Sequence, residues 1–126
     1  MFNSYCLFSN SQKSESPALQ TGVILLSPAD FQKKLNTAKG ILLDVRTPQE
    51  FKKGHLKGAR LLNIFDDTFD AEINKLDKKQ TYFVYCQSGG RSAEACEMMR
   101  KKGFFFLYDM DGGFGKWKLM GLPSEQ

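Results

Sequence analysis

Short apolar runs alternate with amphipathic segments along most of the chain. Runs of four or five residues rich in β-branched, aliphatic and aromatic side chains are typical of buried strands. They predict strands at residues 23–26, 41–45, 61–64, 81–85 and 104–108. The segments between them predict helices opening at 27–30 and 47–50, then over 67–76 and 91–102, with a last helix after Gly112 that carries Trp117.

Two of these helices have clear start signals. Ser27 is followed by Pro28, so a hydroxyl cap precedes a proline in the first turn. Thr47 and Glu50 have the spacing of a capping box, in which each side chain satisfies a backbone amide at the helix start. Glu50 is therefore interpreted as a cap.

The alternation of strands and helices predicts an α/β fold. Strands separated by helices favour a mostly parallel central sheet, here of about five strands, with helices on both faces. In such sheets ligands bind at the carboxyl ends of the strands. The chain length of 126 residues fits one domain, which we expect to span residues 22–126.

Residues 1–21 differ in composition from the rest. They are rich in Ser, Asn and Gln and show no periodic apolar face, so we interpret them as a flexible leader or tether. No basic residue precedes Lys13, which argues against a secretory signal. We expect a cytoplasmic protein; export or membrane tethering through the leader, with Cys6 as an attachment point, is the alternative.

Composition and charge narrow the function classes. The formal net charge is +4, but the basic residues occur in dispersed pairs rather than in one cluster, so nucleic acid is not an expected partner. No apolar run approaches the roughly 18–20 residues of a membrane span. Three cysteines and one histidine form no zinc-like spacing, and no metal or organic cofactor is expected. A monomer with free thiols is expected.

The strongest chemical signal follows the strand at 81–85. Here Cys86 begins the sequence Cys-Gln-Ser-Gly-Gly-Arg-Ser, which leads into the helix at 91–102. Glycines allow successive backbone N–H groups to turn inward as a nest, and a helix N-terminus adds partial positive charge. The same field stabilises a thiolate, the reactive form of cysteine. The alternative is a small buried cysteine in a tight turn; the adjacent Gly-Gly-Arg favours an anion-handling cysteine.

These residues resemble the single-domain rhodanese-like sulfurtransferases over about residues 22–124. Four segments match the family in order: Leu43–Arg46 with Glu50–Phe51 and Gly54–Ala59; Asn63-Ile64; the loop Cys86–Arg91, which fits C-x-x-G-x-R; and Met110–Gly113 with Trp117 and Gly121–Pro123. Phe65 departs from the pattern, because a proline is common there.

The resemblance implies that Cys86 is the nucleophile and carries sulfane sulfur as a persulfide. It also implies that the amides of Gln87, Ser88, Gly89, Gly90 and Arg91 cradle the sulfur and its charge. The implied donor is thiosulfate or a persulfide, and the implied acceptor is cyanide, a thiol or a partner protein. Arg91 is expected to pack behind the loop and brace it through its fork of donors.

Two other functions are compatible with this fold. Phosphatases and arsenate reductases place five residues between Cys and Arg, whereas only four intervene here, so the ring of amides is too small for a tetrahedral phosphate. A non-catalytic binding or regulatory module that keeps the fold is the second alternative, and the intact Cys-Gly-Arg loop argues against it.

The remaining candidates are assigned supporting or structural roles. Asp44 and Arg46 are expected to form an ion pair that ties a strand to the loop, and Ser92 supports the loop beside Arg91. His55 is expected to form a hydrogen bond in a turn, and Cys96 to fill the core rather than resolve a disulfide.

Overall fold

A computed structural model describes residues 22–126 and shows a five-stranded sheet in which every pairing is parallel. The strand order is β3-β7-β6-β4-β5, which places β6 at the centre. This architecture confirms the predicted α/β class with a parallel sheet. The leader predicted at 1–21 lies outside the described residues.

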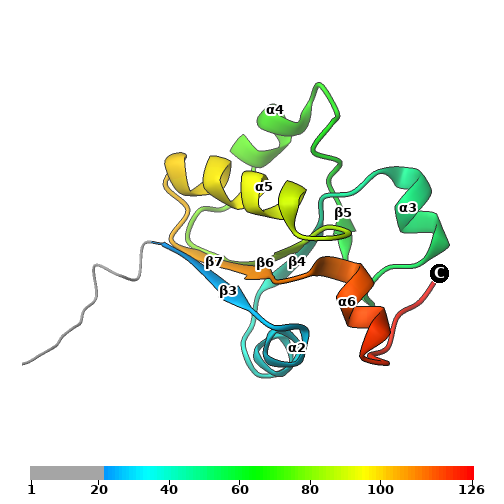
Figure 1. The fold of residues 1–126 in the computed structure, drawn as a ribbon. Helices are drawn as coiled ribbons and strands as arrows, with labels where there is room; N and C mark the ends of the chain where they lie inside the picture. The colour runs from blue at the N-terminus through cyan, green and yellow to red at the C-terminus, as the bar shows by residue number, and fades with distance from the viewer. Residues whose placement is uncertain (1–21) are drawn as a thin grey trace, which may run out of the picture.

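Strands and helices alternate along the described chain (Figure 1). The strands are β3 (Val23–Leu26), β4 (Ile41–Asp44), β5 (Arg60–Leu61), β6 (Thr81–Tyr85) and β7 (Phe106–Met110). The helices are α2 (Pro28–Thr37), α3 (Pro48–Lys53), α4 (Phe69–Asn74), α5 (Gly90–Lys101) and α6 (Gly113–Leu119).

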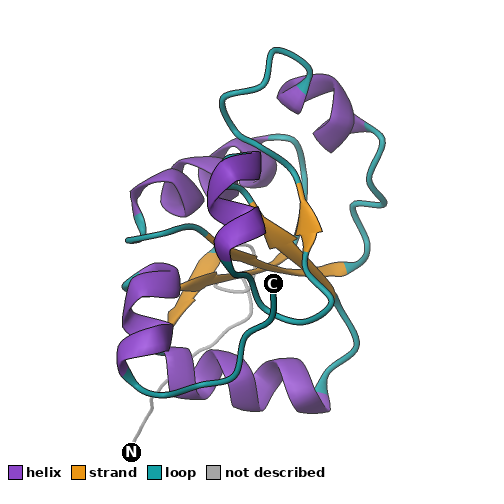
Figure 2. Ribbon diagram, turned by 90° about the vertical axis from the view of Figure 1, so that its right-hand side faces the viewer, coloured by secondary structure: helices purple, strands orange, loops and turns teal. Residues whose placement is uncertain are grey.

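The sheet separates two apolar cores (Figures 1 and 2). Helices α4 and α5 cover one face, where the buried residues include Val84, Cys96 and Met99. Helices α2 and α6 cover the other face with Phe31, Phe114 and Trp117. Both faces of the sheet are therefore buried. This explains why the sequences of β4 and β6 are continuous apolar runs rather than alternating apolar and polar residues.

The strand predicted at 104–108 is wrong by two residues. Gly103 ends the preceding turn with a φ of 99°, and the buried ring of Phe104 packs edge-on against Tyr82, with ring centroids 5.3 Å apart, before the sheet pairing begins. The ladder to β6 starts only at Phe106, which pairs with Thr81. Strand β7 therefore extends to Met110, two residues nearer the loop than expected.

The strand predicted at 61–64 is also shorter than expected. Only Arg60 and Leu61 form a regular ladder with β4. The chain nevertheless continues beside β4, because the amides of Leu62 and Ile64 donate to the carbonyls of Asp44 and Val45 at 2.8 and 3.1 Å. Helix α4 likewise spans fewer residues than the predicted 67–76, because the turns at Asp66–Thr68 and Lys75–Leu76 are not α-helical.

Both predicted helix starts are confirmed. The Ser27 hydroxyl accepts from the amide of Asp30 at 3.2 Å. At α3 the Thr47 hydroxyl accepts from the Glu50 amide at 3.3 Å, and a Glu50 carboxylate oxygen accepts from the Thr47 amide at 3.1 Å. This reciprocal capping box fixes a helix of only six residues beside the carboxyl ends of the strands.

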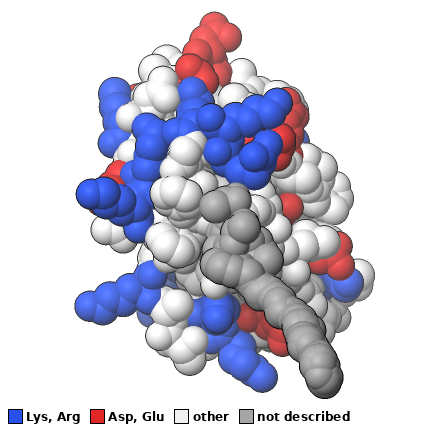
Figure 3. All heavy atoms as spheres, turned by 90° about the vertical axis from the view of Figure 1, so that its left-hand side faces the viewer, with Lys and Arg blue, Asp and Glu red and all other residues white. Residues whose placement is uncertain are grey.

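Charged side chains are spread over the surface. On the face shown in Figure 3, Lys and Arg side chains lie in several groups separated by uncharged surface, with acidic side chains among them. In the part of the chain that the structure describes, no helix is both long enough and apolar enough to span a bilayer.

Candidate active site

The loop that follows β6 is wrapped around the sulfur of Cys86. Cys86 is buried, with 1% of its surface exposed. Gly89 adopts a φ of 114°, a conformation that glycine tolerates and side chains do not, and its amide donates to Cys86 Sγ at 3.1 Å. Helix α5 begins at the next residue, so the partial positive charge of its N-terminus lies beside the loop. This arrangement can stabilise a negative charge on sulfur.

Helix α6 holds the outer side of the loop. The amide of Phe114 donates to the Cys86 carbonyl at 2.8 Å, and the amide of Gly115 donates to the Gln87 carbonyl at 3.0 Å. Gly113 permits this approach: a Cβ there would lie 2.5 Å from the Cys86 carbonyl oxygen and 2.6 Å from Gln87 backbone atoms. Sequence reasoning placed Gly112-Gly113 at a helix start but missed that this start touches the loop.

Arg91 braces the loop through a two-pronged ion pair with Glu50. Its Nη1 and Nη2 donate to the two carboxylate oxygens at 2.8 and 2.9 Å. The Arg91 hydrogen bonds and those from Thr47 lower the pKa of Glu50 to about 2 against the cost of burial. Glu50 is therefore more than the cap that the sequence predicts, because it also joins α3 to the loop. The exposed Phe65 ring lies 5.7 Å from the Arg91 guanidinium carbon.

Arg46 connects β4 to Gln87 in the loop. Burial disfavours its cation, but hydrogen bonds and charge attraction from Asp44 raise the pKa of Arg46 above its ordinary value. Its Nε and Nη2 donate to the Asp44 carboxylate. Nη2 also donates to the Gly54 carbonyl at 2.7 Å. Nη1 donates to Gln87 Oε1 at 3.1 Å. The guanidinium stacks over Phe114, 4.5 Å from the ring centroid. Asp44 and Arg46 thus form the predicted ion pair, and the contact with Gln87 orients a loop side chain.

Tyr85 completes this buried polar group. Its hydroxyl donates to Asp44 Oδ2 at 2.6 Å and accepts from the Leu56 amide at 3.1 Å. Burial, together with the Asp44 carboxylate, raises the pKa of Tyr85 far above its ordinary value, so the phenol stays neutral. It therefore serves as a fixed donor that ties β6 to the segment after α3.

His55 and Cys96 lie outside the loop Cys86–Arg91. His55 Nδ1 lies 2.8 Å from the Phe51 carbonyl oxygen and its Nε2 lies 3.6 Å from Glu125, which agrees with the predicted role in a turn. Cys96 is fully buried in α5, and burial raises the pKa of its thiol well above the ordinary value. Such a thiol is a packing residue rather than a nucleophile.

One hollow of the described surface lies away from the loop. It lies between α2 and the C-terminal segment and is lined by residues that include Gln32, Leu35, Trp117 and Glu125. None of Cys86–Arg91 lines it. Chemistry rather than cavity volume therefore identifies the loop Cys86–Arg91 as the candidate site. Within residues 22–126, no three His, Cys, Asp or Glu side chains come together as metal ligands.

The arrangement of a cysteine, an amide-lined loop and a following helix agrees with known proteins. Residues 27–120 match the family model of the rhodanese-like domain. The chain belongs to the rhodanese-like domain family, and its fold is of the sulfurtransferase type.

Several proteins illustrate this relationship. YqhL of Bacillus subtilis (strain 168) is 39% identical over 79 residues, which make up 63% of this chain and 61% of that protein, so the match spans less than two thirds of this relative. The polysulfide-sulfur transferase homodimer of Wolinella succinogenes is 32% identical, with a TM-score of 0.69 over 86% of this chain and 82% of that chain. A rhodanese-like domain protein of Staphylococcus aureus is 27% identical, with a TM-score of 0.66 over 75% of this chain and 90% of that chain.

The two loop glycines provide a matched pair of substitutions. Gly89→Ala forces a side chain into a positive φ and should destabilise the fold by about 1–2 kcal/mol. Gly90→Ala meets open space in an ordinary helical position, so the free energy of unfolding should be unchanged or slightly higher. Urea unfolding of the two variants tests this contrast. Equal losses would show that the Gly89 conformation is not what shapes the loop.

The Glu50–Arg91 pair predicts a defined pH dependence. Because the pKa of folded Glu50 is lowered to about 2 from 4.5, its stabilisation is complete above about pH 4.5 and is lost as the pH falls toward 2. A double-mutant cycle of Glu50→Gln and Arg91→Gln, measured by urea unfolding, should give a coupling on the order of 1 kcal/mol at pH 7. The coupling should shrink below about pH 4.5.

The exposed Arg100–Glu97 pair on α5 is the control for this cycle. It has the same chemistry and similar distances, but both side chains are about half exposed. Solvent screens such pairs, so its coupling should be smaller than that of Glu50 and Arg91. A coupling of equal size in the two pairs would contradict a special role for Arg91 in bracing the loop.

Proposed function

We propose that this protein is a sulfurtransferase that carries sulfane sulfur as a persulfide on Cys86. The observation that carries the proposal is the Gly89 amide held 3.1 Å from Cys86 Sγ at the start of α5. That amide already faces the sulfur before any substrate arrives, so little reorganisation is needed at the moment of transfer.

The proposed transfer has two steps. The Cys86 thiolate attacks the outer sulfur of a donor such as thiosulfate, a new S–S bond forms, and sulfite leaves with the electron pair of the broken bond. The outer sulfur keeps its negative charge and becomes the terminal atom of a persulfide. An acceptor such as cyanide or a thiolate then attacks this atom, and Cys86 leaves as a thiolate. No proton is transferred in either step, so an acid or base beside the sulfur is unnecessary.

The donor and acceptor belong to the proposal as chemical classes. The Wolinella succinogenes neighbour is a polysulfide-sulfur transferase, which supports a sulfane donor of the persulfide or polysulfide kind for this chain. The exposed Phe65 beside Arg91 offers an apolar contact for a thiol-bearing protein acceptor near the loop. A monomer in the cytoplasm remains our expectation, although the Wolinella neighbour is a homodimer.

The structure also bears on the phosphatase alternative. In a loop that grips phosphate, the arginine must present its guanidinium to the anion. Here both terminal nitrogens of Arg91 donate to Glu50, so those donors face α3. Together with the four-residue spacing between Cys86 and Arg91, this supports binding of a single sulfur atom rather than a tetrahedral oxyanion.

Sulfur loading should depend on Cys86 alone. After incubation with thiosulfate, the intact mass of the parent should rise by one sulfur atom, and dithiothreitol should remove it. Cys86→Ser should lose this adduct and cyanide-dependent thiocyanate formation, because a hydroxyl is not ionised near pH 7. Cys96→Ala is the matched control and should retain both. Equal thiocyanate formation by Cys86→Ser and the parent would overturn the proposal, and would leave the non-catalytic module as the better account.

Loop length provides an independent test. Insertion of one small residue between Ser88 and Gly89 would give five residues between Cys86 and the arginine. The wider ring of amides should grip a single sulfur less well, so we expect sulfur transfer to fall by about tenfold or more. Aryl phosphate hydrolysis, assayed in parallel, should be absent from the parent and appear only in the longer loop. If the parent protein hydrolyses aryl phosphates faster than it forms thiocyanate, the result would favour the phosphatase alternative.

A further inference from the structure

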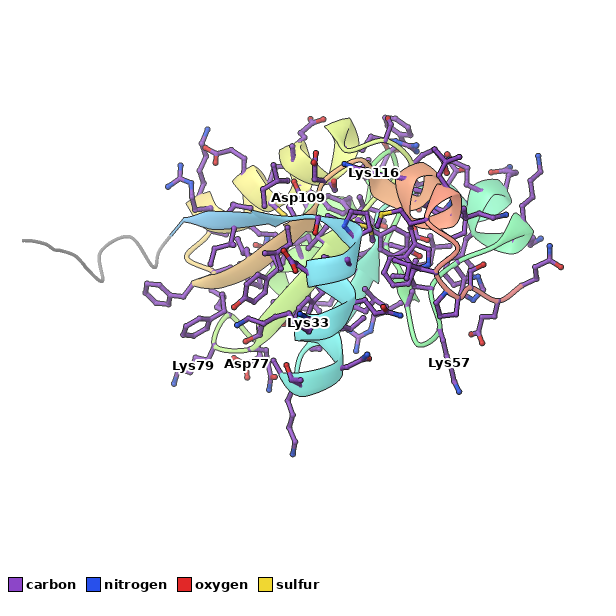
Figure 4. The ribbon with its side chains drawn as sticks, turned by 60° about the horizontal axis from the view of Figure 1, so that its bottom comes forward. Lys33, Lys57, Asp77, Lys79, Asp109 and Lys116 are labelled. Carbon is purple, nitrogen blue, oxygen red and sulfur yellow. The ribbon has the colours of Figure 1, made fainter. Side chains whose placement is uncertain are left out.

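A buried carboxyl group lies behind the loop and has no role in the proposed transfer. Asp109 lies on β7 (Figure 4). It pairs in register with Val84 of β6 and is 4% exposed. Its Oδ1 has no hydrogen-bond partner among the described residues. An incompletely satisfied buried carboxyl is costly, and an apolar side chain of similar size would make a more stable core. This cost calls for an explanation.

The position of Asp109 places it on the face of the sheet that α5 covers. Side chains alternate along β7, and Leu107, two residues earlier, packs in the core beneath α5 with Cys86 and Cys96. The Ser92 hydroxyl of α5 lies close enough to the Asp109 carboxyl to lower the pKa of that carboxyl. Ser92 is itself fully buried, and its Oγ lies 3.5 Å from Cys86 Sγ. A buried chain of polar groups therefore leads from Asp109 through Ser92 to the sulfur.

We propose that Asp109 is a positioning residue that controls the direction of the Ser92 hydroxyl and, through it, the fraction of Cys86 present as thiolate. The inference rests on the proposed role of Cys86 as the nucleophile. A hydroxyl has one proton to donate and two lone pairs. In the structure the Cys86 thiol donates to Ser92 Oγ, and the Ser92 hydroxyl donates to the Gly89 carbonyl at 3.2 Å.

The two protonation states of Asp109 act on this hydroxyl in opposite ways. Ionised Asp109 attracts the Ser92 proton, so that the serine oxygen presents a lone pair to the Cys86 S–H and favours the neutral thiol. Asp109 that has taken up a proton from solvent no longer competes for the Ser92 proton, which can turn to an anionic sulfur. A thiolate at Cys86 and a charged Asp109 also repel each other in a poorly screened interior.

The groups around Asp109 determine the pH at which its carboxyl changes protonation state. Burial is the main cause that raises the pKa of Asp109 to about 6, and Asp111 adds to it, whereas Ser92 and the Met110 amide act in the opposite direction. The thiols of Cys86 and Cys96 and the phenol of Tyr82 belong to the buried cluster on the same side of the sheet. Strand β3 pairs with β7 but contributes only Val, Ile and Leu. No lysine or arginine forms an ion pair with Asp109 in the described part of the chain.

Asp109→Asn tests the proposal because it keeps the shape and removes the titration. The readout is the rate at which iodoacetamide alkylates Cys86, followed by peptide mass from about pH 5 to 8. We expect the ratio of variant to parent rates to be about one at the acid end and to rise with a midpoint near pH 6. Above pH 7 the ratio of variant to parent rates should reach about threefold or more. This corresponds to an about threefold higher ratio of thiolate to thiol at Cys86 in the variant. Urea unfolding at pH 7 verifies the fold.

Two further variants identify the route. Asp111→Asn removes the same charge from an exposed position two residues away. Because Asp111 helps to raise the pKa of Asp109, this variant should move the midpoint slightly toward lower pH but leave the alkylation rate above pH 7 unchanged. In a Ser92→Ala background, Asp109→Asn should have less than half of its original effect. A ratio that stays flat with pH would overturn the proposal, and an undiminished effect without Ser92 would overturn the relay through the hydroxyl. Alkylation needs no sulfur donor, so failure of sulfur transfer would not be mistaken for failure of this inference.

Discussion

A loop that turns its N–H groups inward must turn its carbonyl groups outward, and those carbonyls need donors. This constraint links the parts of the molecule that surround Cys86. The Cys86 and Gln87 carbonyls are satisfied by the amides of Phe114 and Gly115 at the start of α6. Those amides have no acceptor within their own helix, so one contact satisfies two sets of otherwise unpaired groups. The close approach requires glycine at position 113, because any side chain there would collide with the loop backbone.

Two arginines hold the loop from opposite ends and use different neighbours. Arg46 comes from the end of β4 and fixes the Gln87 side chain, while its own charge is compensated by Asp44 and by the face of Phe114. Arg91 comes from the first turn of α5 and is held by Glu50 on α3. Buried or half-buried charges of this kind contribute little net stability, because desolvation offsets their attraction. Their value lies in geometry: both guanidinium groups fix loop atoms relative to the carboxyl ends of β4 and β6.

The sequence predicted the parts of this arrangement that depend on local patterns. Apolar runs and caps located the strands and α3, and the Cys-Gly-Arg spacing identified the loop. Contacts between distant residues were missed, because no local pattern records them. Glu50 was interpreted as a cap, and its pairing with Arg91 depends on how α3 and α5 meet at the end of the sheet. Strand boundaries were wrong at Phe104, where packing against Tyr82 outweighs the β propensity of an aromatic run.

Asp109 is the clearest case of a residue that pattern reading cannot find. It follows the run Phe104–Tyr108 and resembles an ordinary polar residue at the end of a strand. Only the two-residue shift of β7 and the packing of α5 bury it.

The charge balance of the proposed reaction explains why such a carboxyl matters. Thiolate and persulfide each carry one negative charge at nearly the same place, so the loop must stabilise an anion throughout the cycle. Fixed amide dipoles do this without exchanging protons. A buried carboxylate behind the loop works against them, and its effect disappears when it is protonated. In this proposal the amides of the loop favour the anionic sulfur at every pH, whereas the opposition from Asp109 changes within the neutral range.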